Sequence, residues 1–192
     1  MTALILGLVL FLGIHSVRFV ADAARSRFIT QRGAKAWRGL YSLVSAIGLV
    51  LIVWGYSLAL QHPVVLRSPP AWARPLASAL TLPAIVLIAA AYVPRNHFKV
   101  WFGHPMVLGT ALWAIAHLLA TGTLAGVLLF GGFLLWAALC FGSLRARDHA
   151  AGVQRSAGAW MPSAIAVVIG AVLWFAFGRW VHAWLTGINP LA

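Results

Sequence analysis

The chain has 192 residues, of which 62% are hydrophobic and 8% are charged, and its formal net charge is +12. A soluble domain of average composition is about a quarter charged, so this composition excludes an ordinary soluble protein. The basic residues lie between apolar runs and not on a polar face, so the charge favours anchoring of loops beside a membrane over nucleic-acid binding.

Six apolar runs are long enough to cross a membrane, and they are apolar on every face. Such runs form helices, because a membrane barrel needs polar residues at every second position. We predict membrane helices at Leu4–Val20, Leu40–Leu60, Leu76–Val93, Met106–Ala120, Leu124–Phe141 and Pro162–Leu185. Gly33, Pro94 and Gly103 are among the residues that separate them. The sequence therefore predicts an all-α integral membrane bundle of about six helices, forming one domain over residues 1–192, with its first helix retained.

Lys and Arg are divided unevenly between the two sides of this bundle. Eleven fall on the side of the predicted loop that follows the first helix, and three fall on the other side, namely Arg67, Arg74 and Arg179. Basic loops stay in the cytoplasm, so both termini are predicted to lie outside. The connection Thr121–Thr123 is so short that the fourth and fifth helices are predicted to be antiparallel neighbours.

Side chains for acid-based chemistry are scarce. Asp22 and Asp148 are the only acids, both in predicted loops between arginines, and Cys140 is the only cysteine. A catalytic carboxylate pair, a carboxylate-held metal, a disulfide and a thiolate cluster therefore lack their residues. The seven histidines remain, of which four lie at or beyond predicted helix ends, where we expect solvated or interfacial side chains: His62, His97, His149 and His182.

His15 lies inside the first predicted helix, where an ionisable side chain is costly and usually faces the bundle interior or a ligand. Phe11 precedes it by one turn, and Arg18 follows on the same face. An imidazole beside an aromatic ring and a cation suits haem. The imidazole would coordinate the iron, and the guanidinium of Arg18 would pair with a propionate. The alternative is a histidine that is hydrogen-bonded to a neighbouring helix.

Two further histidines belong to the fourth predicted helix. His117 follows Trp113 by one turn, among small residues that allow close approach of a helix or a flat cofactor. His104 precedes Pro105 at the helix start. It lies thirteen residues before His117, about 140° away around the helix, so we do not expect the two to hold one metal. His104 is predicted to cap the helix or to act on a substrate.

The segment around these histidines resembles a known family. The residues that carry the likeness are Gly103-His104-Pro105-Met106-Val107-Leu108-Gly109, Leu112-Trp113-Ala114-Ile115-Ala116-His117-Leu118-Leu119-Ala120-Thr121-Gly122, Gly13-Ile14-His15-Ser16 and Arg18. The chain resembles the NnrU family of bacterial membrane proteins and the related plant and cyanobacterial 15-cis-zeta-carotene isomerase. This likeness places it in a bacterial inner membrane.

The resemblance implies haem b with two axial histidines, which correspond to His15 and His117, and a His-Pro position that corresponds to His104. It implies either a link to nitrite and nitric oxide reduction, as in NnrU members, or haem-dependent isomerisation of a cis double bond. The chain departs from the isomerase pattern at Gly103, where the isomerase has arginine, and in residues 124–141, which lack its double histidine.

Three functions remain open. The first is a haem b protein that acts on a lipid-soluble substrate or with a membrane redox partner. The second is an S-adenosylmethionine-dependent enzyme, because His104-Pro105 and Gly109 resemble the entry motif of isoprenylcysteine carboxyl methyltransferases. The third is a non-enzymatic assembly subunit of a membrane reductase.

In the predicted topology His15 and His117 differ in depth by roughly 10 Å, so His15 with His104 is the rival ligand pair.

Overall fold

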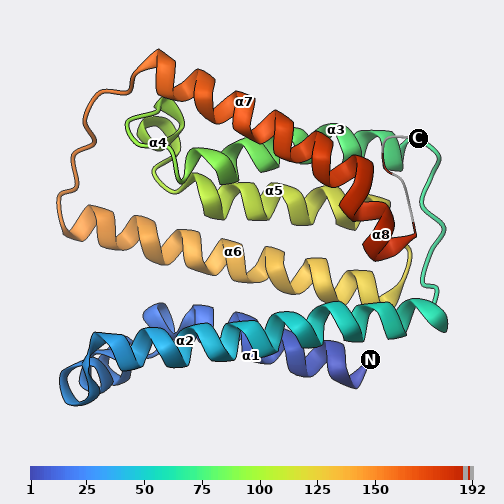
Figure 1. The fold of residues 1–192 in the computed structure, drawn as a ribbon, viewed down its shortest axis with the longest axis horizontal. Helices are drawn as coiled ribbons and strands as arrows, with labels where there is room; N and C mark the ends of the chain where they lie inside the picture. Colours follow the sequence, from blue (N-terminus) through green and yellow to red (C-terminus); the bar gives the residue numbers. More distant parts are fainter. Residues whose placement is uncertain (188–189, 191–192) are drawn as a thin grey trace. The chain divides into compact units, whose positions relative to one another are not determined.

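The computed structural model describes residues 1–187 and 190, and 81% of it is helical (Figure 1). Its elements are α1 (Thr2–Val20), α2 (Asp22–Gln61), α3 (Ala73–Ala90), α4 (His97–Phe102), α5 (Pro105–Ala120), α6 (Leu124–Ala150), α7 (Trp160–Ala176), the π-helix η1 (Phe177–Val181) and α8 (His182–Thr186). Within the described residues, five helical segments are long and apolar enough to span a membrane, and α5 is a shorter apolar helix. The predicted all-α membrane fold is confirmed.

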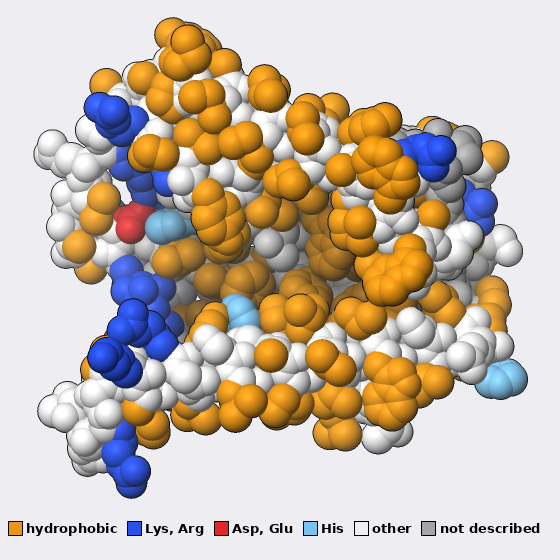
Figure 2. Space-filling model, in the orientation of Figure 1, with side chains coloured by type: hydrophobic (Ala, Val, Ile, Leu, Met, Phe, Trp, Pro, Cys, Tyr) orange, Lys and Arg blue, Asp and Glu red, His pale blue; other side chains and the backbone are white. Residues whose placement is uncertain are grey.

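Apolar side chains cover much of the surface of these helices. Val9, Val50 and Val168 are each more than half exposed. Figure 2 shows hydrophobic side chains along the helices and Lys and Arg side chains near helix ends. This distribution is typical of helices that face lipid along their length and water at their ends. A multi-pass membrane protein is therefore the class that the fold defines.

The chain divides into two compact units. The first comprises Met1–Leu66 and Thr123–Gly132, and the second comprises residues 67–122 and 133–192, so α6 begins in one and ends in the other. Residues 188–189 and 191–192 lie outside the described part. The single domain predicted over residues 1–192 stays a prediction.

In the first unit, α1 and α2 pack side by side along their lengths (Figure 1). Glycines bring their backbones into direct contact. A Cβ atom on Gly7 would lie 2.6 Å from the backbone nitrogen of Ile52, and one on Gly48 would lie 2.8 Å from the backbone nitrogen of Phe11. Small residues of this kind let membrane helices approach closely where no hydrophobic force drives them together.

The predicted break at Gly33 is confirmed, but the predicted loop around it is wrong. Gly33 has φ 85° and ψ 157° within α2, a conformation that glycine adopts without steric cost. The residues on both sides of it are helical, starting at Asp22. This basic stretch is rich in Ala and Arg, which favour helix whether or not lipid surrounds them.

In the second unit, α3 packs against both α5 and α7. A Cβ atom on Gly109 of α5 would lie 2.6 Å from the carbonyl oxygen of Ala84, and one on Gly170 of α7 would lie 2.5 Å from the Cα atom of Val86. The indole of Trp174 also donates a hydrogen bond to the hydroxyl of Thr81, at 3.0 Å, which joins α7 to α3. Close packing at small residues and the hydrogen bond of Trp174 therefore hold α3, α5 and α7 together.

Replacing Trp174 by phenylalanine should lower the free energy of unfolding of the detergent-solubilised protein by roughly 0.6 to 1 kcal/mol, because hydrogen bonds between membrane helices contribute about that much. Trp184→Phe is the matched control, since Trp184 is 81% exposed. Thermal unfolding followed by circular dichroism measures both. An equal loss in the two variants would contradict a specific role for the Trp174 hydrogen bond.

The helix that follows the short 121–123 connection is longer than predicted. It continues to Ala150 instead of ending at Phe141. In the second unit, Trp113 of α5 lies edge-on to Phe133, with ring centroids 5.5 Å apart, and His104 lies edge-on to Phe141, at 6.3 Å. The later residue of the α5 region, Trp113, thus contacts the earlier residue of α6, and the earlier residue, His104, contacts the later one. The two helices are therefore antiparallel, as predicted.

Candidate functional site

His15 is held by the turn of α1 that precedes it. Its Nδ1–H donates a hydrogen bond to the backbone carbonyl of Phe11, at 2.6 Å, and its ring stacks on that of Phe11 with centroids 4.3 Å apart. The ring of Tyr41 of α2 also lies beside that of His15, tilted by 57°, with centroids 5.1 Å apart. The carbonyl can only accept, so Nδ1 carries the proton and the lone pair of the neutral ring is on Nε2.

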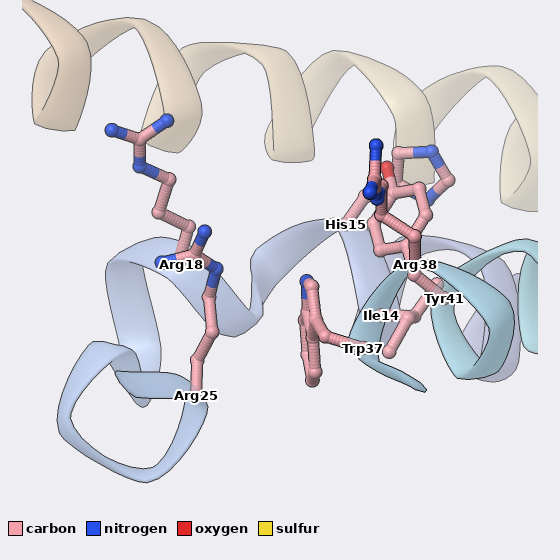
Figure 3. Close-up of a pocket in the computed structure, with 7 residues that line it drawn as sticks. All are labelled: Ile14, His15, Arg18, Arg25, Trp37, Arg38 and Tyr41. Atoms are coloured by element: carbon pink, nitrogen blue, oxygen red, sulfur yellow. The ribbon is translucent and has the colours of Figure 1, made fainter. Parts of the chain in front are cut away.

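A pocket of about 270 Å³ opens beside His15, at the end of α1 (Figure 3). Its lining residues come from both helices of the first unit: Ile14, His15, Arg18, Arg25, Trp37, Arg38 and Tyr41. His15 and Arg18 therefore line one pocket, as their spacing predicts. Trp37, Arg38 and Tyr41 join them from α2, which spacing along the first helix could not indicate.

His117 repeats the arrangement of His15 in the second unit. Its Nδ1–H donates to the backbone carbonyl of Trp113, at 2.8 Å, and the two rings lie 5.0 Å apart. The ring of His182, which directly follows η1, lies 6.3 Å from that of His117. As in His15, the neutral ring therefore has its lone pair on Nε2.

His104 occupies a different kind of site, in the second unit. It precedes α5, and its Nε2–H donates to Oδ2 of Asp148, at 3.0 Å. The guanidinium of Arg155 pairs with the same oxygen. All three side chains are about 20 to 25% exposed. One carboxylate thus joins the start of α5, the last turn of α6 and the segment that follows α6.

The backbone at Gly103 fits this cluster. Gly103 has φ 76°, and a Cβ atom there would collide with the guanidinium of Arg155. A second pocket of about 270 Å³ lies beside it, lined by Ala91, Lys99, Gly103, His104, Pro105, Met106, Val107 and Leu144. Asp148 as the partner of His104, and Arg155 as the partner of Asp148, were missed from the sequence, because Asp148 was predicted to lie in a loop.

Two histidines expected at helix ends have protein partners. His97 makes a hydrogen bond through Nδ1 to the hydroxyl of Ser163, at 2.9 Å, and its ring lies tilted against that of Trp160, with centroids 4.3 Å apart. His182 makes one through Nδ1 to the hydroxyl of Thr186, at 3.1 Å. The contact between His97 and Ser163 joins α4 to α7, which gives His97 a structural role.

No three His, Cys, Asp or Glu side chains are grouped to hold a metal ion in the part of the chain that the structure describes. A haem iron needs only one or two protein ligands, because the porphyrin supplies four nitrogens. One histidine from each unit, His15 and His117, is therefore enough in number to ligate a haem iron.

The helices and these histidine sites define a multi-pass membrane protein whose polar chemistry rests on His, Arg and two carboxylates. The model of the NnrU protein family matches residues 3–190, nearly the whole chain. The protein belongs to the NnrU family. Comparison with curated proteins and with solved structures gave no match.

Proposed function

We propose that the protein binds haem b, with His15 and His117 as the axial ligands. The observation that carries the proposal is the shared geometry of the two histidines. Each donates Nδ1–H to the carbonyl of an aromatic residue one turn earlier, Phe11 or Trp113. Histidines that bind metals almost always donate their other ring N–H in this way, which fixes the tautomer and orients the ligating nitrogen.

The surroundings of each histidine suit a porphyrin. Phe11 and Trp113 offer apolar ring surfaces beside the imidazoles. Arg18 lines the pocket at His15, where its guanidinium would meet a propionate carboxylate. When bound, haem supplies one-electron chemistry, and the protein supplies binding, orientation and electrostatics.

The contacts of His104 favour His117 as the second ligand. A porphyrin iron is reached through Nε2, the ring nitrogen farther from the backbone, and in His104 this nitrogen binds the carboxylate of Asp148. We assign His104 instead to the neighbouring pocket, as a catalytic group whose ring is oriented by Asp148. In that role it would exchange a proton with a lipid-soluble substrate.

The proposed role is haem-based redox chemistry in the bacterial inner membrane. It serves nitrite and nitric oxide reduction through a membrane redox partner, or the redox-dependent isomerisation of a lipid-soluble polyene such as zeta-carotene. Membership of the NnrU family supports the first of these.

The methyltransferase alternative loses one support, because Gly109 packs against Ala84 of α3 and needs no ligand to explain it. Nothing specific favours the assembly subunit.

The absorption spectrum of the full chain, expressed with haem supply and purified in mild detergent, tests the proposal. We expect a near-stoichiometric b-type spectrum, oxidised and dithionite-reduced, confirmed by the pyridine haemochrome assay. His15→Ala and His117→Ala should each lose haem or become high-spin, because each removes one axial ligand. His62→Ala, at an exposed position after α2, should bind haem as the wild type does.

Three outcomes would contradict the proposal. A folded, monodisperse but colourless wild-type protein would exclude haem binding. Unchanged spectra in both histidine variants would exclude this ligand pair, and His104→Ala would then test the rival pair. If the double variant His15→Ala, His117→Ala kept the physiological role, the assembly-subunit function would replace the haem proposal.

A further inference from the structure

Three arginines from separate parts of the chain line the pocket at the end of α1. Arg18 comes from the last turn of α1, Arg25 from the first turn of α2, and Arg38 from α2 beyond the break at Gly33. The chain reverses after α1 and breaks again at Gly33, and these two changes of direction bring the arginines together. Arg25 and Arg38 belong to one basic stretch of α2, and the fold brings both to the same pocket as Arg18 of α1.

The pocket carries more positive charge than the first unit neutralises. Asp22 is the only acid in the residues of this unit, all of which the structure describes. Its side chain is 56% exposed and pairs with Arg25 at 3.4 Å. Asp22 pairs with Arg25, so the one carboxylate of this unit offsets one of the positive charges that line the pocket. An anion in the pocket would offset the remaining repulsion.

The geometry of the pocket suits a phosphate group. The guanidinium of Arg25 lies 5.8 Å from the ring centroid of Trp37, which restrains its orientation. Figure 3 shows the three guanidinium groups pointing to the same side of the helices, with Trp37 between Arg25 and Arg38 in this view. Arginine binds phosphate through two parallel N–H donors, so guanidinium groups turned to one side suit a tetrahedral anion.

The position of the pocket indicates where the phosphate comes from. The pocket lies where the apolar run of α1 ends, and Ile14, Trp37 and Tyr41 form its apolar and aromatic walls. Phospholipid phosphates lie at this level of a bilayer, beside aromatic side chains at the interface. We propose that the pocket binds the phosphate of an anionic membrane phospholipid, chiefly through Arg25 and Arg38. This site goes beyond the proposed haem function and does not depend on it, because the phosphate is assigned to Arg25 and Arg38 while Arg18 is left for the haem propionate.

The test removes two charges either from the pocket or from nearby positions in the same helix. The pocket variant is Arg25→Gln with Arg38→Gln, and the matched control is Arg27→Gln with Arg32→Gln, which lie in α2 but do not line the pocket. Native mass spectrometry of the full chain in detergent measures binding of phosphatidylglycerol, with zwitterionic phosphatidylcholine for comparison. We expect preferential phosphatidylglycerol binding, weakened about ten-fold or more in the pocket variant and less than about three-fold in the control.

Equal weakening of phosphatidylglycerol binding in both variants would overturn the proposal, because net charge alone would then explain binding. Unchanged binding in the pocket variant would also overturn it. Size-exclusion chromatography checks that each variant is folded. If the glutamine pair does not fold, Arg25→Lys with Arg38→Lys decides, since lysine keeps the charge but loses the two-donor geometry. Wild-type affinity in that lysine variant would overturn a site built on arginine.

Two further titrations identify the source of the phosphate. Millimolar inorganic phosphate should leave phosphatidylglycerol bound, and displacement would assign the pocket to a soluble anion instead. Haem-free and haem-loaded protein should bind the lipid equally. Displacement by haem would make a propionate the occupant and overturn the lipid assignment. Binding by a wild-type protein that takes up no haem would leave this site standing while the proposed function fails.

Discussion

Replacing Gly7 by leucine should separate α1 from α2 and lower the free energy of unfolding by about 3 kcal/mol. Any Cβ atom at Gly7 would lie within 2.6 to 2.9 Å of backbone atoms of Leu51, Ile52 and Gly48. Backbone atoms cannot move aside as a flexible side chain can, so the whole helix must shift. The shift would also move Phe11 and His15, which lie one and two turns farther along α1. Thermal unfolding in detergent, together with size-exclusion chromatography, measures the loss.

Gly13→Leu is the matched control on the same helix. Gly13 is exposed, and a Cβ atom there would meet no other atom within 4 Å. Leucine also favours helix over glycine, so this variant should be at least as stable as the wild type. If Gly7→Leu were as stable as Gly13→Leu, the two helices could not be packed at backbone distance.

Replacing Asp148 by alanine should cost about 2 kcal/mol of stability. The carboxylate binds both His104 and Arg155, and its side chain is only 22% exposed. Its removal leaves the guanidinium of Arg155 half-buried against Gly103 without its counterion, and leaves Nε2 of His104 without its acceptor. The free energy of unfolding measures the loss, and hydrogen exchange at the backbone amides of Gly103 and His104 shows whether it is local.

The chain offers a matched control, because its other acid is exposed. Asp22 pairs with Arg25 at 3.4 Å and is 56% exposed, and exposed ion pairs contribute little. Asp22→Ala should therefore change stability by less than about 0.5 kcal/mol. Equal losses in the two variants would mean that the Asp148 cluster stabilises the protein no more than a surface pair does.

The apolar runs predict the membrane helices well but not where the helices end. Leu124 begins α6 as predicted, yet the helix continues nine residues past Phe141. Arg145 and Arg147 mark where the sequence stops being apolar. This change indicates where the helix leaves the lipid, and it does not indicate where the backbone stops being helical. No glycine or proline stops the helix between Ser143 and Ala150. The same reasoning explains why the basic stretch after α1 is helix and not loop.

The candidate site was predictable where its residues are close in sequence. Helical spacing places Arg18 on the face of His15, and the aromatic residue one turn before each histidine supplies the carbonyl that its Nδ1–H binds. Contacts between different helices do not follow this regular spacing along the sequence. Tyr41 reaches His15 from α2, and Asp148 reaches His104 across 44 residues. No spacing rule in a single sequence connects these residues.

That separation of 44 residues also sets an order of events during synthesis. The glycine contacts between α1 and α2 require only the first 61 residues of the chain. The corner at Gly103–Pro105, by contrast, leaves the ribosome before Asp148, and Arg155 emerges later still. The translocon must therefore hold or release α5 with the imidazole of His104 still lacking its carboxylate. A nascent chain that stalls before α6 is complete would display this histidine without the partner that orients it in the finished protein.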